Sequence, residues 1–176
     1  MKADEAGIVI SGRRWSASDF VRADGTPGPW TSQALEADPL SFEAELGRFL
    51  TEFFSHGAAV TVHTSGSTGA PKAFAAEKSR MRASARATIA FLGLKPGCTN
   101  LLAMPLRFIA GKMVVVRSAE CGLNLIPVEP CANPFLEHRE AADLCALTPM
   151  QAATVLANPA TSRYLLKSRA RSEERR

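Results

Sequence analysis

The chain has little of the chemistry that metal sites and disulfide frameworks need. Its 176 residues include three histidines, at positions 56, 63 and 138, and four cysteines, at 98, 121, 131 and 145. None of these residues stand in the close pairs typical of zinc ligands, and a domain of this length can bury a core without cross-links. We therefore expect neither a metal site nor a disulfide scaffold.

Long apolar runs are also missing. No stretch of 18 apolar residues occurs, and the opening segment MKADEAGIVISGRRW lacks the apolar core of a signal peptide. We therefore expect no membrane partner and a cytoplasmic location, where thiols stay reduced.

Basic charge is concentrated at one end of the chain. The net charge is +4, and residues 163–176 alone carry six basic and two acidic side chains, which also gives +4. A nucleic-acid-binding domain carries its basic excess on a folded face, so no nucleic acid partner is expected. The charged end has few apolar residues, which predicts a domain over 1–162 followed by a basic, disordered tail over 163–176.

Short apolar strands alternate with amphipathic helices along the chain. A small hairpin is predicted over 7–20 and a Gly- and Pro-rich loop over 23–30. Further strands are predicted at 58–63, 101–104, 123–128 and 143–147, and helices at 38–56, 78–92, 108–119 and near Gln151. Asp38 and Pro39 provide a favourable start for the first of these helices. The alternation indicates an α/β fold, with a mostly parallel sheet flanked by helices.

A segment rich in glycine and hydroxyl groups directly follows the strand at 58–63. Backbone N–H groups, hydroxyls and a lysine can all donate to phosphate oxygens, and the segment has no carboxylate to repel them. The ligand that this composition predicts is a polyphosphate, bound by Thr64, Ser65, Gly66, Ser67, Thr68, Gly69 and Lys72. The glycine spacing does not fit GxxxxGK[ST], and Ser67 does not stand in a GxSxG pattern.

The string T-S-G-S-T-G-A-P-K resembles the phosphate-binding signature of the adenylate-forming superfamily, which includes acyl-CoA synthetases, amino-acid-adenylating domains and luciferases. A second string, Met104 to Lys112, is similar to the P-L-x-H-x-x-G motif of that superfamily. Phe108 occupies its histidine position, which borders the acyl pocket in the family, and Gly111 is its glycine. The following run most resembles o-succinylbenzoate–CoA ligases of menaquinone biosynthesis.

The resemblance implies ATP with Mg²⁺ and CoA as the ligands of the complete family enzyme. It covers only the early part of the family's N-terminal domain. The family's aromatic-Gly-x-Thr-Glu motif is absent from the sequence, because no aromatic residue is followed by glycine, and its ribose-binding Asp and catalytic Lys are not found. We therefore expect an incomplete N-terminal domain that retains the phosphate loop but is not catalytically self-sufficient, and we assign no catalytic residue and no metal ligand.

An alternative is a stand-alone nucleotide- or phosphate-binding module, or a split-enzyme subunit completed by a partner chain. In either case an incomplete parallel sheet predicts an exposed edge and self-association or a partner. Two side-chain roles stay open at this point. Arg80, Arg82 and Arg86 could assist phosphate or CoA binding or simply form an exposed helix face, and His63 could be a base or a packed residue.

Overall fold

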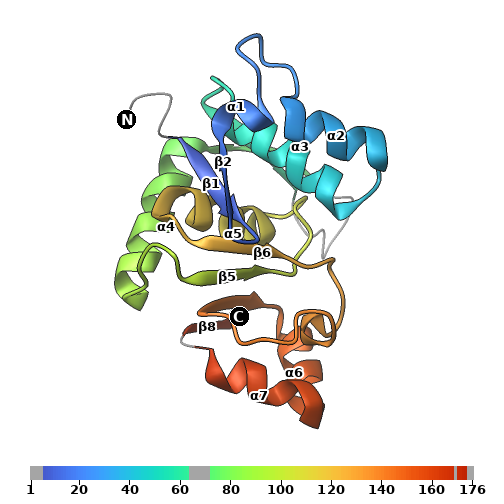
Figure 1. Cartoon of the computed structure of the whole chain (residues 1–176). Helices are drawn as coiled ribbons and strands as arrows, with labels where there is room; N and C mark the ends of the chain where they lie inside the picture. The colour runs from blue at the N-terminus through green and yellow to red at the C-terminus, as the bar shows by residue number, and fades with distance from the viewer. Residues whose placement is uncertain (1–5, 64–71, 169, 174–176) are drawn as a thin grey trace.

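A six-stranded sheet organises the molecule (Figure 1). In this computed structural model, which describes residues 6–63, 72–168 and 170–173, the strand order is β2-β1-β6-β5-β7-β8. β1 (Gly7–Ile10) pairs antiparallel with β2 (Arg13–Ser16), and the other neighbours are parallel. The remaining strands are β5 (Thr99–Leu102), β6 (Asn124–Pro127), β7 (Leu144–Leu147) and β8 (Ala170–Glu173). The expected α/β fold with a mostly parallel sheet is confirmed.

Helices cover the sheet and extend from both of its ends. They are α1 (Ala17–Phe20), α2 (Pro29–Ala37), α3 (Phe42–Phe54), α4 (Lys78–Leu92), α5 (Ile109–Cys121), α6 (Pro149–Ala157) and α7 (Pro159–Lys167), with a 3₁₀ turn, η2, at Pro134–Leu136. Figure 1 shows α1, α2 and α3 gathered at one end of the molecule and α6 and α7 at the other. The main core lies between α3, α5 and the sheet.

The apolar stripe of α3 is confirmed as a core face. Leu46, Phe49, Leu50 and Phe53 are all buried and pack with sheet residues such as Ile8 and Leu102. This spacing of i, i+3, i+4 and i+7 places the side chains on one side of the helix.

The predicted N-cap of α3, Asp38, was wrong by three residues. Ser41 is the N-cap, and its hydroxyl accepts a hydrogen bond from the Ala44 N–H at 3.1 Å. Asp38 instead accepts from the Leu40 N–H at 2.9 Å, within the turn that joins α2 to α3. A capping residue can serve a turn as readily as a helix start, so Asp38 alone did not fix the boundary.

The predicted loop over 23–30 was wrong at its end, because α2 begins at Pro29. Proline is compatible with the first helical position, where an N–H would have no partner. The Gly-Pro composition that suggests a loop therefore also fits the start of a helix.

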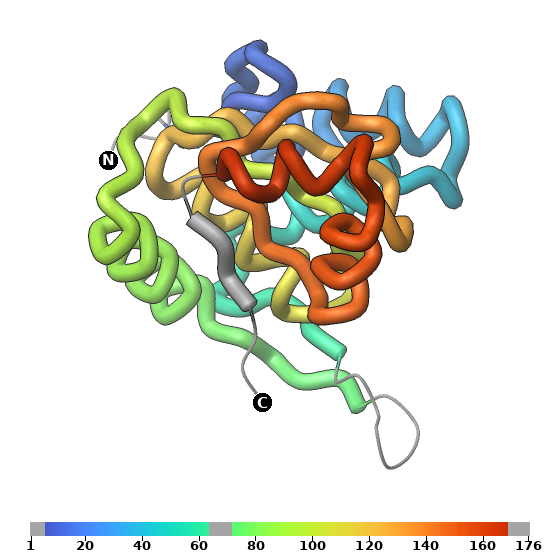
Figure 2. The backbone as a smooth tube through the Cα atoms, turned by 90° about the horizontal axis from the view of Figure 1, so that it is seen from below, coloured from blue at the N-terminus to red at the C-terminus, as the bar shows by residue number. Residues whose placement is uncertain are grey.

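The strand expected at 58–63 forms as β3 (Ala59–His63), outside the six-stranded sheet. It pairs antiparallel with β4 (Ala73–Glu77) in a separate two-stranded sheet. Figure 2 shows this hairpin at the margin of the molecule. An apolar strand carries no signal for which sheet it joins, since that choice depends on distant partners.

The predicted tail from residue 163 is helical over its first five residues. α7 continues to Lys167, with Leu165 buried and the Tyr164 ring stacked on Phe135 at 6.0 Å. The backbone of β8 then pairs in parallel with β7. The packing of Leu165 and Tyr164 attaches α7 to the domain. Strand pairing uses backbone N–H and C=O groups, and every residue except proline provides both.

Candidate functional site: a cavity at the switch point of the sheet

The order of the parallel strands creates a crevice at the carboxyl ends of β5 and β7. The chain leaves β5 toward β6 on one side, whereas β7 lies on the other side of β5. The segments that follow β5 and β7 therefore diverge, and open α/β sheets bind ligands at such a point. Topology alone makes this crevice the first place to look for a substrate site.

A cavity of about 250 Å³ lies there. Most of its walls are apolar side chains from the first half of α5 and from the ends of β5 and β7. Its lining residues are Met104, Ile109, Ala110, Met113, Arg117, Ala146, Leu147 and Thr148. A mainly apolar lining with a few polar groups is the composition usual in small-molecule sites.

Arg117 is the charged residue of this lining. It is half-buried on α5, and burial lowers the pKa of its guanidinium. Its Nε atom is buried and has no hydrogen-bond partner among the residues that the structure describes. A buried N–H group without an acceptor is costly, which makes Arg117 an unusual residue of this lining.

Gly111 lies in the first turn of α5, against the segment after β5. A Cβ atom added to it would stand 2.4 Å from the Pro105 carbonyl oxygen and 2.9 Å from that of Met104. The glycine therefore lets α5 begin close to the end of β5, where the cavity forms.

Phe108 stands beside the hairpin and is not among the residues that line the cavity. It forms a parallel bridge with His63, and the His63 N–H donates to the Arg107 carbonyl at 3.0 Å. The Arg107 guanidinium lies 4.6 Å from the centre of the Phe108 ring. These contacts place the end of β3 against the start of α5.

The predicted phosphate-binding residues fall mainly outside the described residues. Six of the seven lie outside them, namely Thr64, Ser65, Gly66, Ser67, Thr68 and Gly69. The seventh, Lys72, is exposed and directly precedes β4. His63, directly before the segment, is half-buried and hydrogen-bonded through its backbone. The phosphate-binding role of these seven residues stays a prediction.

The sequence interpretation missed Gln151 and Arg117. Gln151 forms a capping box at the start of α6 with Thr148 and also donates to the carbonyl oxygens of Ala103 and Cys131. The string T-P-x-Q signals the capping box, but nothing in it signals the two distant carbonyls. For Arg117 there was no signal, because it stands within an apolar helix run.

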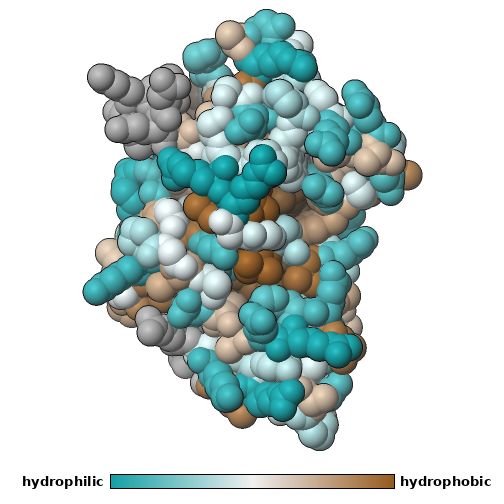
Figure 3. Space-filling view, viewed as in Figure 1, coloured by the Kyte–Doolittle hydropathy of each residue, from teal (hydrophilic) through white to brown (hydrophobic). Residues whose placement is uncertain are grey.

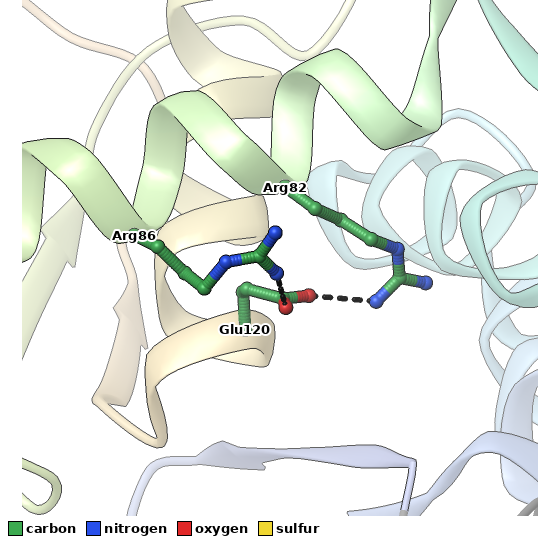
Figure 4. Close-up of polar contacts among 3 residues, drawn as sticks. All are labelled: Arg82, Arg86 and Glu120. Atoms are coloured by element: carbon green, nitrogen blue, oxygen red, sulfur yellow. Dashed lines mark hydrogen bonds and ion pairs between the residues drawn. The ribbon is translucent and has the colours of Figure 1, made fainter. Parts of the chain in front are cut away.

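The three α4 arginines whose roles were left open all have acidic partners. Arg82 and Arg86 both bind the Glu120 carboxylate on α5, with an Arg82–Glu120 distance of 2.7 Å (Figure 4). Arg82 also covers the Phe53 ring at 4.5 Å. Arg80 pairs with Glu77 at the exposed surface. These contacts link α4 to α5 and to α3, and they give the arginines a structural role.

A second hollow, of about 600 Å³, lies between the N-terminal hairpin and α3. Trp15, Trp30 and Phe42 are among its lining residues. Figure 3 shows apolar residues gathered near the middle of this face of the molecule, surrounded by hydrophilic ones.

Over the described residues, no group of three or more His, Cys, Asp or Glu side chains is placed to hold a metal ion. In that same part of the chain, no helix has the length and apolar character needed to cross a membrane.

Comparison with known proteins gives matches among solved structures. The chain is similar to an acyl-CoA synthetase (AMP-forming)/AMP-acid ligase II-like protein from Dyadobacter fermentans, with a TM-score of 0.65 and 34% identity over 70% of this chain and 36% of that one. No family model matches the chain, and no curated protein sequence does.

Two more distant structures share the fold. ATP-bound MatB from Rhodopseudomonas palustris has a TM-score of 0.55 at 16% identity, over 64% of this chain and 23% of that one. MenE from E. coli, with a bound analogue of OSB-AMS, has a TM-score of 0.51 at 21% identity, over 64% and 24%. The chain thus spans about a third or less of the length of these proteins. It resembles one part of the family of AMP-forming acyl-CoA synthetases and AMP-acid ligases and has their α/β fold.

Proposed function

We propose that the chain is the part of an AMP-forming acid–thiol ligase that binds the phosphates of ATP and the acid substrate. It does not catalyse the reaction on its own. The observation that carries this proposal is the 34% identity to the Dyadobacter acyl-CoA synthetase-like protein, together with a cavity at the switch point of the sheet. In the reaction, a carboxylate oxygen attacks the α-phosphorus of ATP and pyrophosphate leaves. The CoA thiol then displaces AMP from the acyl-adenylate. We place the protein in the cytoplasm.

The phosphate loop supplies fixed donors to the leaving pyrophosphate. Thr64 to Gly69 offer backbone N–H groups and hydroxyls, and Lys72 offers an ammonium group. Donors that are already oriented stabilise developing charge more strongly than water does, because they need not reorganise. The bond from the His63 N–H to the Arg107 carbonyl supports this assignment, since it holds His63, which directly precedes the loop in the sequence, beside the start of α5. ATP is proposed to bind as its magnesium complex, with no residue assigned to the metal.

The acid is proposed to carry a second carboxylate. Arg117 has a buried Nε without an acceptor and lines the mainly apolar cavity. A guanidinium can bind a carboxylate through two parallel hydrogen bonds. o-Succinylbenzoate has an aromatic ring and two carboxylates, so one can bind Arg117 while the other faces ATP. This substrate would place the complete enzyme in menaquinone biosynthesis.

The test is calorimetric titration with Mg·ATP. We expect binding by the wild type and a Kd raised roughly tenfold or more in Lys72→Ala, the loss typical of one charge-assisted hydrogen bond. Lys95→Ala is the matched control, because Lys95 is also exposed but follows the end of α4 that is farthest from β4. An identical Kd in the wild type and Lys72→Ala would contradict the role of the loop.

Acid binding is tested with o-succinylbenzoate and benzoate. Arg117→Met is expected to weaken binding of o-succinylbenzoate and leave benzoate unchanged, since benzoate has no second carboxylate. Arg80→Met, at the exposed ion pair with Glu77, is the control. An equal loss of affinity for both acids in Arg117→Met would show that Arg117 does not bind a second carboxylate.

A further inference from the structure

Gln151 has every hydrogen-bonding position of its side-chain amide filled. Nε2 donates to the carbonyl oxygens of Ala103 at 2.9 Å and Cys131 at 2.8 Å. Oε1 accepts from the Thr148 N–H at 3.0 Å and from the Thr148 hydroxyl at 3.3 Å. A primary amide has two donor hydrogens and two acceptor lone pairs, so this set uses all four. Only 7% of the residue is exposed.

The three partners of Gln151 follow three adjacent parallel strands. Ala103 comes directly after β5, Cys131 lies in the segment after β6, and Thr148 comes directly after β7. Residues next to these contacts line the cavity, namely Met104 and Leu147, and so does Thr148 itself. One side chain therefore joins the carboxyl ends of the strands whose divergence forms the cavity.

The capping box does not account for this arrangement. Capping requires only that Oε1 accept from the Thr148 N–H and that the Thr148 hydroxyl accept from the Gln151 N–H. Both contacts are present, the second at 3.2 Å. The two Nε2 bonds are additional, and they span 48 and 20 residues of sequence. A glutamate at this position would cap the helix equally well, but its charged oxygen would face two carbonyl oxygens.

We infer that Gln151 is a positioning residue that holds the segments after β5, β6 and β7 in register and thereby sets the shape of the acid-binding cavity. The inference rests on the proposed function for its link to the acid. Its consequence is that Gln151 controls how well the cavity distinguishes an acid with two carboxylates from an acid with one. It does so without touching either acid, because Gln151 is not among the residues that line the cavity.

The first variant is Gln151→Glu, with Gln33→Glu on the exposed surface of α2 as its matched control. The measurement is the ratio of Kd values for benzoate and o-succinylbenzoate. We expect Gln151→Glu to reduce this ratio at least fivefold and Gln33→Glu to leave it unchanged. A residue that acts only on stability lowers the folded fraction and changes both Kd values by the same factor. An unchanged ratio in Gln151→Glu therefore overturns the inference.

A second variant and a second measurement keep the test independent of acid binding. Gln151→Met keeps the length of the side chain and buries no charge, so it is the substitute if the glutamate variant does not fold. Hydrogen exchange is read at Val128, whose N–H donates to Leu102 at 2.9 Å across the ends of β6 and β5. We expect at least tenfold faster exchange there in either Gln151 variant and no change in Gln33→Glu. If the wild type binds neither acid, the proposed function fails while the exchange still decides the positioning role. Wild-type exchange at Val128 in both variants overturns that role.

Discussion

Gly111 combines a place in a ligand-binding motif with a demand made by packing. The family resemblance assigns it to the acyl-pocket motif, whereas the structure shows that its missing side chain allows α5 to start against the Met104 and Pro105 carbonyls. The two roles are compatible, because the close start of α5 brings Ile109 and Ala110 to the cavity wall. The missing side chain of Gly111 therefore explains both the close packing of α5 and the position of this cavity wall.

Gly111→Ala is expected to destabilise the protein by about 1–3 kcal/mol, the usual cost of forcing an extra methyl group into a packed site. The neighbouring atoms are backbone carbonyls, which cannot turn away as a flexible side chain could. Urea unfolding provides the measurement. Gly57→Ala is the control, since a Cβ there meets nothing closer than 3.7 Å. Equal midpoints for the two variants would contradict the close approach.

Glu120 is the residue through which α4 is fastened to α5. Its side chain is only 11% exposed and binds both Arg82 and Arg86. Glu120→Gln would leave two guanidinium groups without their counter-charge in a partly buried place, so we expect a loss of about 1–2 kcal/mol of unfolding free energy. Glu77→Gln breaks only the exposed pair with Arg80 and should change stability by less than about 0.5 kcal/mol. A loss of less than about 0.5 kcal/mol of unfolding free energy in both variants would show that the Glu120 ion pairs contribute no more than exposed surface pairs do.

At the scale of elements, local pattern predicted most of the chain and failed where distant partners decide. Met81, Ala85 and Ile89 share one helix face, and with Gly93 after them they predicted a helix over 78–92. α4 spans Lys78–Leu92 and ends at Gly93, which adopts a left-handed conformation. β3 was also found, but its membership of a separate hairpin depends on β4, whose exposed residues carry no strand pattern. α7 was missed because its sequence gives few apolar signals beyond Leu165.

α7 offers a direct test of the tertiary contacts that hold the end of the chain. Leu165 is 4% exposed and its neighbour Leu166 is 55% exposed. Leu165→Ala is expected to cost about 2–4 kcal/mol, because it removes buried methyl groups and leaves a cavity beside Phe135 and Val155. Leu166→Ala should change stability by less than about 0.5 kcal/mol. Thermal unfolding distinguishes the two variants. An equally small loss of stability in both would indicate that α7 does not pack against the domain and would support the predicted disordered tail.

At the scale of the whole molecule, the site was predicted only in part. The phosphate loop could be predicted because its residue types suit one ligand chemistry wherever the loop lies, and its role stays a prediction. The cavity could not be identified, because it arises from the order β6-β5-β7 and no local pattern encodes strand order. The strand order also alters the expectation of an exposed edge. β8 covers β7, so β2 and β8 are the outer strands, and self-association through either stays a prediction.

The last prediction concerns catalysis by the chain alone. With Mg·ATP, CoA and o-succinylbenzoate, we expect no acyl-CoA or pyrophosphate above background. The loop and the cavity supply only part of the field around the reacting phosphorus, and the adenine-binding motif of the family is absent from the sequence. Water does not replace groups that orient reactants, because most of the rate gain from positioning comes from fixing them before the reaction. The measurement is a coupled pyrophosphate assay, with Lys72→Ala as the control for contaminating enzymes. Pyrophosphate release that requires the acid and disappears in Lys72→Ala would show that these residues already form a working adenylating unit.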